Sequence, residues 1–347
     1  MEKINVGVLG ATGTVGQKIA LLLDSHPFFK ISDLIASDKN KGKRYKEAVS
    51  WKQEKSIPAE LENKIIKNYR ENMEAKVFFS GMDATAAGEI ENYFAEKGCA
   101  VISNSKNHRM DENVPISIPE VNPEHFLILK KQKTKGFIVT NSNCSTMFLA
   151  LTLAPLHRIF GLEKVFVSTM QAVSGAGYPG FPSLDILANV VPYIGGEEEK
   201  IENELKKMFG TCTGEKIIPA DFEVSAHCCR VPVIDGHTEN VSLKFKKKPT
   251  VDEVKKALSG FRGLTGLPSA PMQPVIVMDE NDRPQPRLDA HRYKGMTAFA
   301  GRIRKCSIFD IKMVIMGHNT IRGAAGAAVL NAEYLYQNDY FKEILNQ

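Results

Sequence analysis

Long apolar runs are absent from this sequence of 347 residues. None of its stretches approaches the roughly 18 consecutive apolar residues that a membrane-spanning helix needs. The first apolar run, which starts at Ile4, leads directly into a glycine turn, so no signal peptide is expected. These absences predict a soluble protein of the cytoplasm that has no membrane partner.

Spaced metal ligands are also absent. None of the six cysteines belongs to a C-x-x-C pair, and a chain of this length does not need disulfide bonds to complete its core. His227, Cys228 and Cys229 are adjacent, so a strand would point neighbouring members to opposite faces instead of toward one ion. We therefore expect cytosolic thiols and no bound metal.

A strong excess of charge of one sign is missing as well. The formal net charge is +5, and the basic run Lys244–Lys248 stands at a probable strand end before Pro249. A protein that binds nucleic acid usually carries a denser basic surface, so no nucleic-acid partner is expected. The mild positive charge suits a protein that handles small anions.

The sequence does contain an alternation of short β-rich segments and helix-like segments. It is typical of a Rossmann-type α/β domain with a parallel sheet, and its strands are predicted at Ile4–Leu9, Ile31–Ala36, Val77–Phe79, Ala100–Ile102 and Phe137–Val139. From Lys164 the pattern changes to that of an α+β domain on a mixed sheet. Its strands are predicted at Val165–Ala172, Val224–Pro232, Val241–Phe245 and Ser307–Met316, and its helices at Ser183–Val191, Glu197–Met208 and Val251–Ser259. We predict a dinucleotide-binding domain at residues 1–143, completed by a C-terminal helix within 320–347, and a catalytic domain at residues 144–319.

A glycine-rich turn follows the first predicted strand. Gly10, Gly13 and Gly16 have the spacing G-x-x-G-x-x-G. Such glycines let the backbone approach a pyrophosphate, and the next helix offers its N-terminal N–H groups to that anion. A strand-to-helix turn can need glycine for geometry alone, but the place after the first strand of the chain favours nucleotide binding.

The end of the second predicted strand bears on the choice between NAD and NADP. Ala36–Arg44 contains four basic residues, and it has Ser37 where an acidic residue would bind the ribose of NAD. This pattern favours NADP, although Asp38 would repel a 2′-phosphate and leaves dual use open. The predicted cofactor contacts in this domain are Gly10, Thr12, Gly13, Thr14, Val15, Gly16, Ser37, Lys39 and Ser80.

Two further segments carry candidate catalytic residues. Cys144 lies in the polar run Asn141–Thr146, just before an apolar-periodic helix, and a helix N-terminus lowers the pKa of a thiol. Arg230 and His237 flank a probable turn, where a histidine can reach a thiol and an arginine can clamp a carboxylate. A buried structural cysteine and a structural histidine are the alternative interpretations.

Taken together, these segments resemble one enzyme family. Residues 224–238 are similar to the signature of aspartate-semialdehyde dehydrogenases, with Cys228, Arg230, Gly236 and His237 at its fixed positions. Asn143–Thr146 resembles the nucleophile box of that family, and the segments 104–110, 170–177 and 317–325 carry further likeness. The resemblance runs from Gly10 to about residue 330, and Arg283–Asp289 is similar to the archaeal and fungal branch.

The resemblance implies a reaction and a set of roles. The reaction is the reversible reduction of L-aspartyl 4-phosphate by NADPH to L-aspartate 4-semialdehyde and phosphate, a step in the biosynthesis of lysine, threonine and methionine. Cys144 would form a thioester, His237 would act as acid and base, and Gln171 would help to place His237. The implied substrate contacts are Arg230 for the carboxylate, Glu197 for the ammonium group (with Glu198 and Glu199 as alternatives), Arg109 and Lys200 for phosphate, and Asn143 beside the nucleophile. The resemblance also implies Gly175 and Asn319 at the cofactor, and a homodimer or homotetramer assembled through the second domain.

Other functions remain open at this point. An acyl-CoA reductase such as a malonyl-CoA reductase would use Cys144, His237 and the NADPH site unchanged, although Glu197 favours an amino-acid substrate. An N-acetylglutamyl-phosphate reductase fits the 224–238 signature less well. A catalytically silent NADP-binding regulator, or a Cys-His acyl hydrolase, represents a different class of protein.

Overall fold

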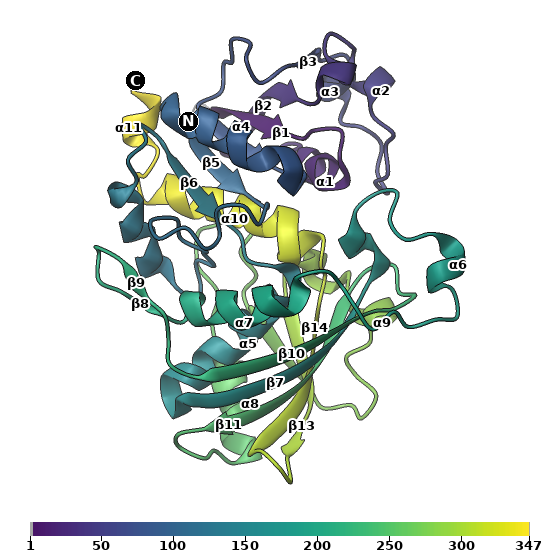
Figure 1. The fold of residues 1–347 in the computed structure, drawn as a ribbon, viewed down its shortest axis with the longest axis vertical. Coiled ribbons are helices and arrows are strands. Elements are labelled where there is room, and N and C mark those ends of the chain that lie inside the picture. Colours follow the sequence, from purple (N-terminus) through teal and green to yellow (C-terminus); the bar gives the residue numbers. More distant parts are fainter. Residues whose placement is uncertain (1–2, 347) are drawn as a thin grey trace.

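The computed structural model describes residues 3–346 and places them mainly around two six-stranded sheets (Figure 1). The first sheet has the order β3-β2-β1-β4-β5-β6, and all of its pairs are parallel. Its strands are β1 (Ile4–Leu9), β2 (Phe29–Ile35), β3 (Ile66–Lys67), β4 (Val77–Ser80), β5 (Ala100–Ser103) and β6 (Phe137–Thr140). The strand order reverses direction between β1 and β4, the point at which open parallel sheets bind nucleotides. The predicted Rossmann-type fold is thereby confirmed.

Helices pack against this first sheet. The longer ones are α1 (Thr14–Leu22), α4 (Ala84–Glu96) and the late helix α10 (Gly326–Gln337), while α2 (Tyr45–Ala48), α3 (Ala59–Glu62) and α11 (Lys342–Leu345) are single turns. The chain returns to this sheet after a π-helix at Ile321–Ala325, and buried α10 side chains, such as Val329 and Leu335, join its hydrophobic core. Figure 1 shows α10 beside β5 and β6, so the two ends of the chain lie in the same half of the molecule.

The second sheet is mixed, as predicted, and has the order β10-β7-β11-β14-β13-β12. Its strands are β7 (Leu162–Gln171), β10 (Glu223–Arg230), β11 (His237–Phe245), β12 (Val275–Met278), β13 (Ala298–Lys305) and β14 (Ile311–Gly317). The helices α5 (Cys144–Phe160), α7 (Glu197–Met208) and α8 (Val251–Gly260) supply most of the rest of its core. A two-stranded ribbon, β8 (Thr211–Cys212) with β9 (Ile217–Ile218), follows α7.

Three local predictions for this half of the chain need correction. The sequence pattern did not indicate β12, which has only four residues, or β13, whose eight residues contain a register irregularity between Gly301 and Arg304. The helix predicted at Ser183–Val191 is only the single turn α6 (Ser183–Ile186), since its apolar residues Leu184, Leu187 and Val190 are exposed and pack against no core. Strand β14 begins at Ile311 rather than Ser307. In residues 3–346, no helix combines the length and the apolar character needed to cross a membrane.

Candidate active site

Cys144 is the first residue of α5, which follows directly from β6. Asn143 caps this helix, because its side-chain Oδ1 accepts hydrogen bonds from the backbone N–H groups of Ser145 (2.9 Å) and Thr146 (3.2 Å). Thirteen of the 17 residues of α5 are buried, so the helix is fixed on every side between the sheet and its neighbouring helices. A nucleophile at its first turn therefore has a fixed position.

His237 faces this thiol from the beginning of β11. Its Nε2 lies 3.1 Å from Sγ of Cys144, and the backbone N–H of Ala172 donates to its Nδ1 at 3.0 Å. A backbone N–H can only donate, so Nδ1 must accept, and a neutral ring then carries its proton on Nε2. We assign this tautomer from the hydrogen-bond network. The proton of His237 consequently points at the sulfur, so the ring donates to Cys144 in this tautomer.

Burial dominates the electrostatics of this pair. It raises the pKa of the Cys144 thiol to about 12, with a further increase from Glu197, while Arg230 and Arg109 act in the opposite direction. Burial also lowers the pKa of His237 to about 3, and the positive charge of Arg230 adds to this effect. The expected lowering of the thiol pKa by the helix N-terminus is therefore outweighed by desolvation. A neutral thiol beside a neutral imidazole is the favoured state in this structure.

Arg230 ends β10 and lies near His237. Its Nη1 donates to the carbonyl oxygen of Ala172 at 2.8 Å, and its side chain is buried. Gly175 packs directly against both residues, because a Cβ atom there would lie 2.9 Å from Nη1 of Arg230 and 3.1 Å from Cε1 of His237. The loop after β7 can approach the catalytic pair this closely only with glycine at position 175.

Helix α7 presents a row of charged side chains to the nucleophile. The carboxylate of Glu197 accepts from Asn143 Nδ2 (2.6 Å) and from Lys200 Nζ (2.7 Å). Glu198 instead accepts from the backbone N–H of Cys228 at 2.9 Å, and Glu199 is exposed. Among the three consecutive glutamates, Glu197 is thus the one that faces Cys144.

Glu204, on the same face of α7, was not found from the sequence. One carboxylate oxygen accepts from Arg109 Nη1 at 2.9 Å, and the other accepts from the backbone N–H of Asn143 at 2.6 Å. Arg109 also donates through Nη2 to the carbonyl oxygen of Asn104 at 2.8 Å. This buried carboxylate connects the expected phosphate-binding arginine to the residue that precedes the nucleophile.

Lys207 completes the row. Its Nζ donates to the carbonyl oxygens of Arg109 (2.7 Å), Asp111 (2.7 Å) and Val114 (2.8 Å), so it holds the segment that carries Arg109. Burial lowers the pKa of Lys207 to about 8. The signal that could have found Glu204 and Lys207 is spacing, because residues 197, 200, 204 and 207 recur every three or four positions on one helix face.

Gln171 does not make the contact expected of it. Its Nε2 is 3.4 Å from Oγ1 of Thr169, and its buried Oε1 has no hydrogen-bond partner within residues 3–346. The next residue, Ala172, orients His237 through its backbone N–H instead. Gln171 still lies at the end of β7 opposite Arg230, so it remains beside the site.

The glycine turn of the first sheet has the geometry that a dinucleotide needs. Gly10 adopts φ +74°, and a Cβ at Gly16 would lie 2.3 Å from the carbonyl oxygen of Gly10. Helix α1 has no side-chain cap at Gly13, which leaves its N-terminal N–H groups, from Thr14 and Val15 onward, available to a phosphate. The residues of this turn therefore fit the cofactor.

The remaining predicted cofactor residues differ in exposure. Ser37 and Lys39 are exposed at the carboxyl end of β2, next to Asp38, whose carboxylate hydrogen-bonds the side-chain amide of Asn68. Ser80 ends β4 beside the glycine turn but is fully buried. Asn319 connects two loops of the site: its Oδ1 accepts from the backbone N–H of Gly236 (2.9 Å), and its Nδ2 donates to Ser174 Oγ (2.8 Å).

Comparisons with known proteins agree with this arrangement. Residues 5–128 match the model of the semialdehyde dehydrogenase NAD binding domain, and residues 153–322 match that of the semialdehyde dehydrogenase dimerisation domain. The aspartate-semialdehyde dehydrogenase of Archaeoglobus fulgidus is 48% identical over 338 residues, which cover 96% of this chain and 98% of that protein. This chain belongs to the aspartate-semialdehyde dehydrogenase family.

Other members of the family give the same result. The aspartate-semialdehyde dehydrogenase of Candida albicans is 46% identical over 359 residues, covering 96% of this chain and 98% of that protein. A crystal structure of the Candida albicans enzyme with NADP superimposes with a TM-score of 0.89 and 44% identity, covering 97% of this chain and 99% of that chain. The resemblance that the sequence indicated, including its archaeal and fungal character, is confirmed, and the rival functions are not favoured.

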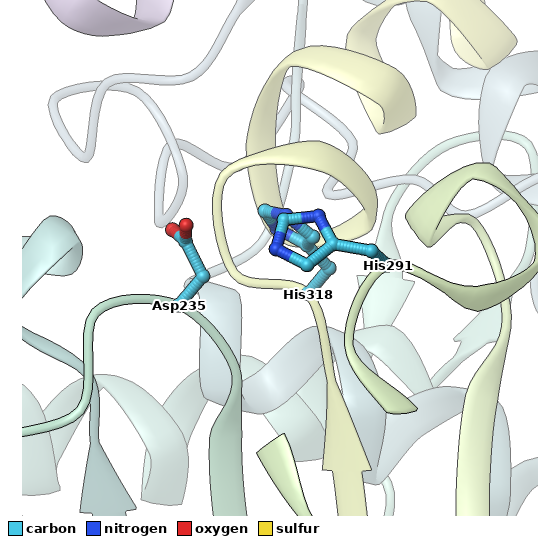
Figure 2. A group of neighbouring side chains, drawn as sticks. All are labelled: Asp235, His291 and His318. Carbon is cyan, nitrogen blue, oxygen red and sulfur yellow. The ribbon is translucent and has the colours of Figure 1, made fainter. Parts of the chain in front are cut away.

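One cluster of side chains near the site was not predicted from the sequence. Asp235, His291 and His318 come together from three separate segments, and their ligand-type atoms all lie within 4.8 Å of one another. Figure 2 shows the imidazole rings of His291 and His318 overlapping in the view, with the side chain of Asp235 to their left. His318 directly precedes Asn319, so the cluster borders the aspartate-semialdehyde dehydrogenase site.

Proposed function

We propose that this chain catalyses the reversible, NADPH-dependent reductive dephosphorylation of L-aspartyl 4-phosphate to L-aspartate 4-semialdehyde. The observation that carries the proposal is the 3.1 Å contact between Cys144 Sγ and His237 Nε2 at the N-terminus of α5, in a chain with full-length relatives of this activity. NADP is supported by the NADP complex of the Candida albicans enzyme and by the basic segment after β2. When bound, NADPH supplies the hydride that reduces the acyl group.

Cys144 acts as the nucleophile in this proposal. Its sulfur forms a bond to the acyl carbon, the bond from that carbon to the phosphate oxygen breaks, and phosphate leaves. The resulting thioester splits one difficult step into two easier ones. After reduction, the bond between carbon and sulfur breaks and the aldehyde is released.

His237 works as the acid and base partner of Cys144. With its proton on Nε2, the ring donates a hydrogen bond to the thiolate and can pass that proton toward the oxygen on which charge develops. A neutral imidazole that donates in a buried site has a precedent in other enzymes. The thiol proton leaves with the departing phosphate as hydrogen phosphate, so the ring of His237 is neutral before and after this step and no imidazolium remains beside the sulfur.

Complementary charges bind the substrate. Arg230 binds the α-carboxylate, Glu197 binds the ammonium group, and Arg109 with Lys200 binds the phosphate. Lys200 and Asn143 already contact Glu197 at 2.7 Å and 2.6 Å, so these groups stand in place before the substrate arrives. Such preorganisation lowers the entropic cost of binding.

We also propose how the chain is organised and where it works. Residues 1–143 with 320–347 form the NADP-binding unit, and residues 144–319 form the catalytic unit, which assembles a homodimer or homotetramer. Support comes from the α10 side chains in the first core and from the dimerisation-domain match over residues 153–322. A cytoplasmic location accords with cysteines that are all free among the described residues.

The first test is a direct assay. L-aspartate semialdehyde, phosphate and NADP⁺ should give phosphate-dependent NADPH absorbance, and malonyl-CoA with NADPH should give no oxidation. Activity with malonyl-CoA alone would keep the fold and the nucleophile but overturn the substrate. Turnover of an acyl substrate without any NADP would instead support a hydrolase.

A further inference from the structure

The cluster of Asp235, His291 and His318 contains three polar groups without strong partners. His318 is 1% exposed, and its Nε2 has no hydrogen-bond partner within residues 3–346, while its Nδ1 has only a long contact of 3.4 Å with Thr320 Oγ1. Across the described part of the chain, the side chains of Asp235 and His291 make no hydrogen bond or ion pair. A buried imidazole nitrogen that lacks a partner costs free energy, so the cluster points to a ligand.

The surrounding backbone holds these side chains in place. Asp235 belongs to the turn before β11, His291 follows the single turn α9 (Pro286–Asp289), and His318 follows β14. Gly236 packs so closely on α9 that a Cβ there would lie 3.0 Å from the Cβ of Pro286. The ring centroids of His291 and His318 are 4.7 Å apart, at an interplanar angle of 82°. The cluster is thus brought together by three separate segments of the chain (Figure 2).

The chemistry of the cluster matches a borderline-soft cation. Two imidazole nitrogens and one carboxylate are ligands that zinc prefers, and such a set leaves one coordination position open. A ring nitrogen coordinates a metal only when it is free of other partners, and the buried Nε2 of His318 has no hydrogen-bond partner within residues 3–346. The charge of Lys18 acts against a cation here, and the carboxylate of Asp235 offsets it.

We propose that Asp235, His291 and His318 form a binding site for a divalent transition-metal ion such as Zn²⁺. Ligand distances of about 2.0–2.2 Å require the three side chains to move inward slightly, which the exposed His291 can do. A cavity of about 240 Å³ adjoins the cluster, and the residues that line it include Thr14, Lys18, Ser174, Tyr178, Asp235 and His291.

The position of this cavity predicts the effect of the metal. Thr14, the first residue of α1 after the glycine turn, lines the same cavity as Asp235 and His291, so an ion held by these two side chains occupies space beside the expected phosphate site. The metal and NADP should then exclude each other, and Zn²⁺ should inhibit the enzyme. This consequence rests on the proposed function, whereas the binding of the metal does not.

The metal itself is tested with Co²⁺, whose visible absorption reports coordination. The titration uses Cys144→Ala, because Cys144 and His237 could otherwise bind the ion themselves. A single Co²⁺ ion per chain should bind to this variant, and the additional substitution His291→Ala should abolish that binding. His227→Ala in the same background is the matched control and should leave it unchanged, since His227 is an exposed histidine on β10. Absence of binding, or binding that survives His291→Ala, overturns the proposal.

The second arm tests the link to the cofactor. In the presence of EDTA, His291→Ala should keep the activity and the KM for NADP of the wild type. The Zn²⁺ concentration for half inhibition should rise by at least about tenfold. If His291→Ala raises the KM for NADP without metal, the cluster belongs to the cofactor site and the proposal falls. The Co²⁺ titration contains no substrate, so it stays decisive even if the enzyme acts on a different acyl compound.

Discussion

Most charged side chains around Cys144 are buried and hydrogen-bonded, whereas the one charged side chain expected at the cofactor 2′-phosphate, Lys39, is exposed. Arg109, Glu197, Glu204 and Arg230 are all less than 8% exposed, while Lys39 lies on the surface. A small zwitterion offers few atoms, so its site must fix several opposite charges at short range. The pyrophosphate of a dinucleotide is instead bound by backbone N–H groups at the start of a helix. The first region depends on the position of each side chain, and the second depends on the backbone.

Replacement of the nucleophile gives the largest expected effect. Cys144→Ala removes the covalent step and should lower kcat by at least about 10⁴-fold. Because the cofactor region does not rely on this side chain, NADPH binding, measured by its fluorescence, should stay within about twofold of the wild type. A large loss of NADPH affinity in this variant would show that the two regions are not independent.

The pH dependence of alkylation tests the electrostatics of the nucleophile region. Since the pKa of Cys144 is raised to about 12, the thiolate fraction should increase roughly tenfold per pH unit through the neutral range. The rate of inactivation by iodoacetamide should therefore rise steadily from acid to alkaline pH. The Cys144→Ala protein corrects for labelling of the other thiols. A plateau around neutral pH would instead indicate a thiolate paired with a protonated His237.

Substitution of Glu204 probes whether the paired charges position the substrate. Glu204→Gln keeps an oxygen for the backbone N–H of Asn143 but removes the negative partner of Arg109. The KM for phosphate should rise by about 10- to 100-fold, while the alkylation rate of Cys144 changes little. Glu198→Gln is the control on the same helix, since Glu198 also accepts from a backbone N–H but lies away from Arg109. A lower Tm with an unchanged KM for phosphate would show that Glu204 stabilises the fold but does not position the substrate site.

The two regions also differed in how far the sequence could predict them. The glycine turn and Cys144 lie in local motifs at the ends of strands, and such motifs can be recognised without knowing the fold. Glu204 could not be recognised in this way, because the role of its carboxylate depends on hydrogen bonds with two residues far away in the sequence, Arg109 and Asn143.

The cluster of Asp235, His291 and His318 could not be predicted from the sequence for the same reason. It exists because β11 pairs with β14 in a register that sets His237 opposite Gly317, which brings residues 235 and 318 together. The tautomer of His237 likewise depends on a backbone N–H from another strand end. Periodicity predicts which segments form a sheet but not the order of its strands.

The smallest expected effect is in the cofactor region. Lys39 is an exposed cation near the expected 2′-phosphate, and such contacts contribute up to about 1 kcal/mol, so Lys39→Ala should raise the KM for NADP by roughly fivefold. The effect should diminish at high salt, because screening weakens exposed charge pairs. NAD lacks the 2′-phosphate, and its KM should not change. Lys30→Ala is the control, since Lys30 is exposed at the opposite end of β2. An equal rise of KM for NAD and NADP would mean that Lys39 contacts a group common to both cofactors. The preference for NADP would then have to be determined by backbone groups as well.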